Sequence, residues 1–154
     1  MLALRRAVRF RRKLRAQGLK VWRTGTLHVG DIRYPVVNAW SADWYAGTDH
    51  DVYASPHYAA LLTHRSHGDM TTTPYVGWHR SLRGVDHPRP DDWIMAMQDR
   101  LVRLYESISR DGYRLECVAD RIAVLPDNTL WDGGNRLACL AALGRMDAPV
   151  VWVQ

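Results

Sequence analysis

A short run of acidic, glycine and basic residues, Asp132-Gly133-Gly134-Asn135-Arg136, stands between a predicted strand and a predicted helix. The first turn of a helix exposes backbone N–H groups and a partial positive charge, so it can hold an anion. Glycines let a phosphate approach the backbone and open the left-handed angles of an anion-binding loop. Arg136 adds a bidentate donor for phosphate, and Asp132 is suited to hold a metal ion or orient an attacking hydroxyl. The run therefore predicts a phosphate site.

The same residues also fit a purely structural corner. Asp-Gly is a common turn, and Asn135 is suited to cap the helix that follows. Arg136 would then pair with Asp132 or with Glu106 instead of a ligand. The spacing of the residues leaves both interpretations open, so the flanking elements have to be considered.

The flanking sequence predicts the elements that position this corner. Pro90, Asp91 and Asp92 favour the start of a long helix, and Gly112 favours its end. The apolar face expected for this helix consists of Trp93, Met97, Leu101, Leu104 and Ile108. The patterns then indicate a strand at 121–125, a turn at 126–129, a short strand at 130–131, a helix at 135–143 and a strand at 148–153. This order predicts an α/β or α+β unit.

The whole arrangement from "LYESISRDGY" through "RIAVL" and "LWDGGNRLACLAALG" to "APVVWV" resembles the ParB/sulfiredoxin-like superfamily. Members share a helix ending in Ser-Ile and Gly, a strand, a polar turn, an Asp-Gly-x-His-Arg corner, an Ala/Leu-rich helix and a Pro-Val strand. The resemblance is best over residues 91–154. It implies a single α+β domain with a small mixed sheet and packed helices, here extended by a basic N-terminal helix.

The resemblance also implies a function. The family binds nucleotide phosphates at this corner, as ATP or CTP and usually with magnesium, and includes partition CTPases, sulfiredoxins and small-molecule kinases. By position, Gly133, Gly134 and Arg136 would bind phosphate and Asp132 would face the metal or the acceptor. Asn135 stands where the family commonly has His, which implies a catalytic or phosphate-binding role. The Asn135 amide can hydrogen-bond phosphate but cannot transfer a proton.

Departures from the family's sequence pattern reduce the number of reactions that can be expected. Sulfiredoxin carries its reactive Cys just before the corner His, where this chain has Gly134, and Cys139 lies a turn further on. Sulfinic acid reduction is therefore not expected. No helix-turn-helix domain of the kind found in partition proteins is expected after Gln154. Phosphoryl transfer from ATP or CTP to an unknown small molecule, or hydrolysis of the nucleotide, is the predicted reaction class.

Residues 19–40 predict short strands, and residues 41–90, which hold six of the seven histidines, predict loops and short helices. The acceptor side of the cleft is expected to come from this half. The candidate cleft residues are His57, Trp78, His79 and Glu106. Aromatic rings beside Arg can stack on a base or anchor a loop. The His and Asp residues between 49 and 67 match no recognised zinc pattern.

The first 23 residues hold nine of the 21 Lys and Arg residues and no Asp or Glu, leaving 12 basic residues against all 16 acidic ones. Leu4, Ala7, Val8 and Leu14 recur at helical spacing, and Gly18 can end the helix. We therefore expect a basic arm at 1–18 and a domain at 19–154. The arm either binds nucleic acid or an anionic membrane, or packs its apolar stripe on the domain.

Other features exclude several classes of protein. At 154 residues and 47% hydrophobic content the chain predicts one globular domain. Its two cysteines lack metal or redox spacing and fit a reduced, cytoplasmic protein. No apolar run is long enough to span a bilayer, and no secretory signal is present, although an Arg-rich, acid-free start also fits a mitochondrial presequence. Two alternatives remain: a non-catalytic DNA-associated or regulatory module using the basic arm, and a protein-interaction domain.

Overall fold

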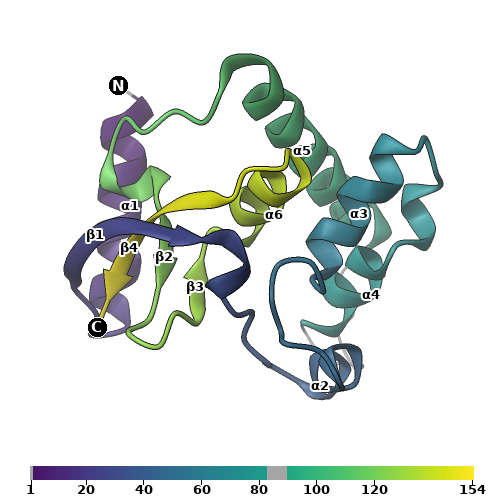
Figure 1. Ribbon diagram of the computed structural model, residues 1–154, viewed down its shortest axis with the longest axis horizontal. Coiled ribbons are helices and arrows are strands. Elements are labelled where there is room, and N and C mark those ends of the chain that lie inside the picture. Colours follow the sequence, from purple (N-terminus) through teal and green to yellow (C-terminus); the bar gives the residue numbers. More distant parts are fainter. Residues whose placement is uncertain (1, 83–89) are drawn as a thin grey trace.

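The computed structural model describes residues 2–82 and 90–154, which form an α+β domain with a four-stranded mixed sheet and six α-helices (Figure 1). The α-helices are α1 Leu2–Ala16, α2 Ala39–Tyr45, α3 Pro56–Arg65, α4 Pro74–Ser81, α5 Asp91–Asp111 and α6 Gly134–Ala142. The strands are β1 Val21–His28, β2 Ile122–Val124, β3 Leu130–Asp132 and β4 Asp147–Val153. Short 3₁₀ turns are η1 Val29–Asp31, η2 Met70–Thr72 and η3 Val118–Asp120. The predicted fold class is confirmed at this level.

The sheet has the strand order β1-β4-β2-β3. Strand β4 runs antiparallel to β1 and parallel to β2, and β3 returns antiparallel to β2. The β2–β3 turn closes with the Leu125 N–H donating to the Thr129 carbonyl at 2.8 Å, and Asn128 takes a left-handed φ of 65°. Because β3 is an edge strand whose last residue is Asp132, the chain leaves the sheet directly into the corner before α6.

Alternating residues of β4 face two different apolar layers. Val150 and Trp152 belong to the main core, with α6 and the helices of the first half, whereas Val151 and Val153 pack in a second cluster with Phe10 and Leu14 of α1. Figure 1 shows α1 on one side of the strands and α6 on the other. The sheet is therefore covered on both faces, and α1 is one of the two covers.

Helix α1 packs on the domain, but not through the stripe that the sequence suggested. Leu14 is buried as expected, whereas Leu4 and Val8 are 69% and 51% exposed. Phe10 takes their place: it is 5% exposed and contacts Trp131 edge to face, with ring centroids 6.0 Å apart. The large aromatic ring buries more apolar area than either aliphatic side chain, which turns the Phe10–Leu14 side of α1 to the sheet.

Other predictions hold with local shifts. Helix α5 spans the predicted region and ends at Gly112, whose φ is 77°. Its buried face is centred on Ile94, Leu101 and Ile108, with Gln98 buried where Trp93 and Met97 were expected. The Gln98 amide donates to the Met70 carbonyl at 2.5 Å, which satisfies its nitrogen, whereas Oε1 has no hydrogen-bond partner among the described residues. Residues 19–40, predicted as several short strands, form only one, β1, followed by η1, an isolated bridge at Arg33 and the start of α2. Among the described helices none has the length and apolar character needed to cross a membrane.

Candidate functional site

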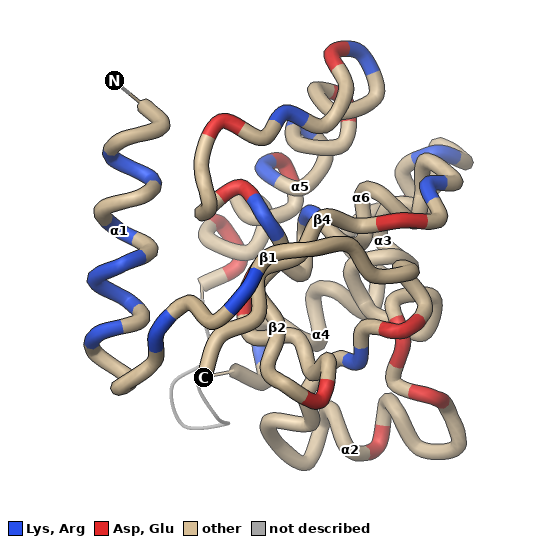
Figure 2. The backbone as a smooth tube through the Cα atoms, turned by 60° about the vertical axis from the view of Figure 1, so that its left-hand side comes forward, with Lys and Arg blue, Asp and Glu red and all other residues tan. Residues whose placement is uncertain are grey.

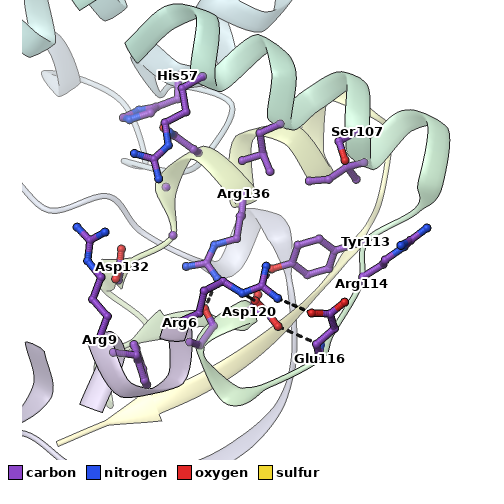
Figure 3. A pocket seen from close by; sticks show the side chains of 18 of the residues that line it. Arg6, Arg9, His57, Ser107, Tyr113, Arg114, Glu116, Asp120, Asp132 and Arg136 are labelled. Carbon is purple, nitrogen blue, oxygen red and sulfur yellow. Dashed lines mark hydrogen bonds and ion pairs between the residues drawn. The ribbon is translucent and has the colours of Figure 1, made fainter. Parts of the chain in front are cut away.

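A pocket of about 870 Å³ opens at the corner between β3 and α6 (Figure 3). Its walls come from α1, α5 from Met97 onward, the loop through η3 and the first turn of α6, and His57 of α3 closes one end. The predicted phosphate residues Asp132, Gly133, Gly134, Asn135 and Arg136 all line it. Its volume lies within the usual range for small-molecule sites. The structure thus places the whole sequence motif on one concave surface.

The corner leaves the start of α6 open to a ligand. Gly133 is the N-cap residue, takes a left-handed φ of 101°, and provides no side chain to cap the helix. Gly134 follows, and its carbonyl accepts a 2.9 Å hydrogen bond from the Tyr34 hydroxyl. Burial raises the pKa of Tyr34 far above its usual range, so this hydroxyl stays a donor. The first N–H groups of α6 have no side-chain cap and border the pocket.

Arg136 does not form either of the ion pairs that a purely structural corner would use. Its guanidinium donates to the Ala119 carbonyl at 2.5 Å, while Asp132 pairs with Lys13 and Glu106 lies 3.8 Å from His64. The charge of Arg136 therefore stays without a carboxylate partner among the described residues. The Tyr113 hydroxyl also interacts with this guanidinium, whose five N–H groups still leave donors for an anion.

The basic N-terminal helix forms one wall of the pocket. Arg6 pairs with Glu116 at 2.6 Å and with Asp120 at 3.2 Å, and Lys13 pairs with Asp132 at 3.0 Å. Figure 3 shows Arg6 and Arg136 reaching the neighbourhood of Asp120 from different elements. The segment expected to be an arm and the corner are thus parts of the same site.

Positive charge exceeds negative charge on the pocket wall. The basic lining residues are Arg6, Arg9, Lys13, Arg100, Arg114 and Arg136, and the acidic ones are Asp111, Glu116, Asp120 and Asp132. Each of these carboxylates is in an ion pair, Asp111 with Arg110 at 3.3 Å. Arg9, Arg100 and Arg114 form no direct ion pair within the described chain. Such an excess of cations favours a polyanionic ligand.

His57 lines the same pocket, at the opposite end from Glu116 in Figure 3. The side chain is 8% exposed and packs against the rings of Tyr34, Tyr75 and Trp78, at centroid distances of 5.6, 5.1 and 6.1 Å. Its Nδ1 is buried and has no hydrogen-bond partner among the described residues. Burial, assisted by His79, lowers the pKa of His57 to about 3, so the imidazole is neutral at physiological pH.

The other candidate cleft residues lie outside this pocket. Trp78 packs near Trp40, with ring centroids 6.0 Å apart, and His79 contacts Tyr75 and Trp93 at 4.3 and 5.3 Å. These rings belong to the aromatic packing between α3, α4 and α5. Glu106 is on the exposed side of α5, where its side chain is 57% exposed.

Several lining residues were not identified from the sequence. Arg6, Arg9 and Lys13 recur at spacings of three and four residues, so their common helix face could have been recognised. Nothing local indicated that this face lies against Asp132. Arg100 and Arg114 gave no signal, because single arginines on a helix or loop are common surface residues.

Asp132 is the single metal ligand that the sequence predicts at this site. Within the described ranges no three or more His, Cys, Asp or Glu side chains converge as a metal site, and this includes the His and Asp residues between 49 and 67. Lys13 bonds Oδ2 of Asp132. Mg²⁺ in nucleotide sites commonly has one or two carboxylates and completes its shell with phosphate oxygens and water. Asp132 could therefore be the single protein ligand of a Mg²⁺ ion.

The cysteines are not reactive groups of this site. Cys139 is buried in α6, and burial raises the pKa of its thiol to about 12. Cys117 is partly exposed, and both cysteines are free. A thiol that is hardly ionised is a poor nucleophile, so Cys139 serves as a small core residue.

Comparison with models of protein families, with curated proteins and with solved structures finds no match. The interpretation of the pocket therefore depends on the geometry and charge described above.

Proposed function

We propose that this protein is a ParB/sulfiredoxin-like nucleotide-binding protein, and that its corner pocket holds the phosphates of ATP or CTP. The observation that carries the proposal is the uncapped N-terminus of α6 opening into a pocket with more basic than acidic lining residues. A helix N-terminus and uncompensated arginines both favour a phosphate chain. The order of elements around the corner supports the family resemblance.

In the proposed complex, the N–H groups that begin at Gly134 bind phosphate oxygens, and Arg136 donates to the same group from within the first turn. Gly133 lets the phosphate approach because it has no Cβ. Lys13 and Arg9 extend the contact along the phosphate chain from α1, since both line the pocket. The pocket would thereby replace much of the water around a highly charged ligand with fixed donors.

The proposed reaction is transfer of the terminal phosphoryl group to a small-molecule hydroxyl or to water. The bond from the γ-phosphorus to its bridging oxygen breaks, a bond to the acceptor oxygen forms, and the acceptor proton is released. Asp132 faces either the acceptor hydroxyl, whose hydrogen bond it would accept, or the metal ion, and Asn135 holds the phosphate through its amide. Mg²⁺ bound to the phosphates would supply further charge neutralisation, with Asp132 as its protein ligand.

His57 has a different part in this proposal. Because burial keeps the imidazole neutral, it can hydrogen-bond an uncharged group of the acceptor without adding a charge. His57 lines the same pocket as Asn135. It therefore brings an imidazole to a pocket whose corner has Asn at the position where the family commonly has His.

Calorimetric titration with ATP, CTP and GTP in the presence of Mg²⁺ tests the proposal. We expect saturable binding of at least one nucleotide, weakened about tenfold or more in Arg136→Ala because a charged hydrogen bond to phosphate is lost. Arg145→Ala is the matched control, since Arg145 is exposed and does not line the pocket. Unchanged affinity in Arg136→Ala would remove the phosphate assignment. Release of inorganic phosphate with and without added alcohols then separates hydrolysis from transfer.

A further inference from the structure

Helix α1 has a third face, which does not contact the sheet and shares only Arg9 with the pocket. Phe10 and Leu14 lie against the sheet, and Arg6 and Lys13 form the pocket's ion pairs. The remaining side carries a shallow hollow, which we term the outward face. It is lined by Leu4, Arg5, Val8, Arg9 and Arg12. Arg9 stands at its border with the pocket.

The outward face combines exposed apolar side chains with unpaired positive charge. Leu4 is 69% exposed and Val8 is 51% exposed, one turn apart on the same side of the helix. Arg5 and Arg12 form no ion pair within the described chain, and α1 contains no acidic residue. Figures 1 and 2 both show α1 at the edge of the molecule, and Figure 2 shows basic positions along its length. This face is therefore free to meet a large, negatively charged partner.

We propose that the outward face of α1 binds an anionic lipid membrane. Leu4 and Val8 would enter the boundary between headgroups and acyl chains, while the neighbouring arginines bind lipid phosphates. Helices that lie in a membrane surface combine these two kinds of side chain, and juxtaposed basic residues are attracted by the negative potential of anionic lipids. Because Phe10 and Leu14 already fix α1 on the sheet, the face is presented by a folded helix and little chain ordering is needed on binding.

A membrane fits the combination better than other partners. Nucleic acid would pair with the arginines, but its phosphate backbone would leave Leu4 and Val8 against a polar surface. A second copy of this chain would bury the apolar residues, but it would bring two arginine rows together. A lipid surface of negative charge accommodates both kinds of side chain.

Cosedimentation of the full chain with vesicles tests the proposal. We expect binding to vesicles of phosphatidylcholine mixed with phosphatidylglycerol, little binding to phosphatidylcholine alone, and weaker binding as salt rises. The double variant Leu4→Ser/Val8→Ser keeps every charge and should bind about tenfold more weakly. Met146→Ser is the matched control, because Met146 is a 57% exposed apolar residue outside α1, and its binding should equal that of the wild type.

Three results would overturn the proposal: no binding to the anionic vesicles, equal vesicle binding by the wild type and the double variant, or tighter binding to duplex DNA than to vesicles at the same salt. If the double variant also bound duplex DNA more tightly than vesicles, the outward face would be assigned to nucleic acid. Circular dichroism of the double variant verifies that α1 is intact, which is expected because both substituted side chains are exposed. Nucleotide is absent from the assay, so its outcome is independent of the pocket's function.

Discussion

Gly133 determines the shape of the phosphate corner. Its φ of 101° belongs to a region that L side chains rarely adopt, and a Cβ at this position would lie 3.2 Å from Nη2 of Arg136. The glycine therefore serves both the turn from β3 into α6 and the close approach of the Arg136 guanidinium. Gly134 differs, because its tight neighbours are the buried side chains of Leu130 and Tyr34, at 3.3 and 3.4 Å.

Substitution of Gly133 by Ala should affect both stability and binding. We expect the free energy of unfolding to fall by about 1–2 kcal/mol from backbone strain. Nucleotide affinity should fall as well, because the Cβ displaces Arg136. Gly144→Ala is the control: Gly144 also has a positive φ, 69°, but open space around its Cβ and no place in the pocket. Denaturant unfolding and calorimetry measure the two effects, and equal nucleotide affinities for both variants would contradict the role given to Gly133.

His57 predicts a pH dependence of stability. Its pKa is about 3 in the folded protein and near 6.5 in the unfolded chain, so between these values the unfolded chain binds the additional proton. The stabilisation is complete above pH 6.5 and is lost as the pH falls toward 3. The contribution of His57 should decrease by about 1.4 kcal/mol for each pH unit in this window.

The variant His57→Phe isolates this contribution because it keeps a ring in the aromatic cluster but cannot be protonated. Denaturant unfolding between pH 6.5 and 5 should give a shallower loss of stability for His57→Phe than for the wild type. Parallel stability profiles for the two proteins would show that the imidazole is not held in its neutral form.

At the scale of elements, the C-terminal half could be predicted from the sequence more fully than the N-terminal half. Helix α5 has acidic residues at its start and Gly112 at its end, and β4 is a continuous apolar strand, so local signals determine both. In the first half, the cap residues Asn38 and Ser55 begin only short helices, α2 and α3, so local signals determine less of the packing there. The side of α1 that packs on the sheet depends on Phe10 filling a space beside Trp131, which no helical spacing reveals.

The packing of α1 can be tested by removing that ring. Phe10→Ala should lower the free energy of unfolding by about 3 kcal/mol, because it leaves a cavity between α1 and the sheet. Val8→Ala, on the exposed side of the same helix, should change it by less than about 0.5 kcal/mol. Thermal or denaturant unfolding distinguishes the two. Equal, small effects would mean that α1 is an independent arm.

At the scale of the whole molecule, the pocket is assembled from segments far apart in the chain. The sequence alone predicted the corner at 132–136, because that motif is contiguous. It did not predict that Lys13 pairs with Asp132, or that Arg100 and Arg114 join the same wall, because these contacts depend on how α1 and α5 pack around the sheet. His57 was a candidate among four, and only the fold separates it from Trp78, His79 and Glu106.

Phosphate bound at the start of α6 would lie against backbone amides, and their chemical shifts measure this contact directly. In a ¹H–¹⁵N titration with ATP and with CTP, the largest changes should fall on the backbone amides of Gly134, Asn135 and Arg136, with smaller changes for Lys13 on the facing wall. The same pattern with inorganic triphosphate would show that the phosphate chain is the recognised group. Unchanged amides at these positions, or shifts confined to the outward face of α1, would show that the phosphate does not bind at the start of α6.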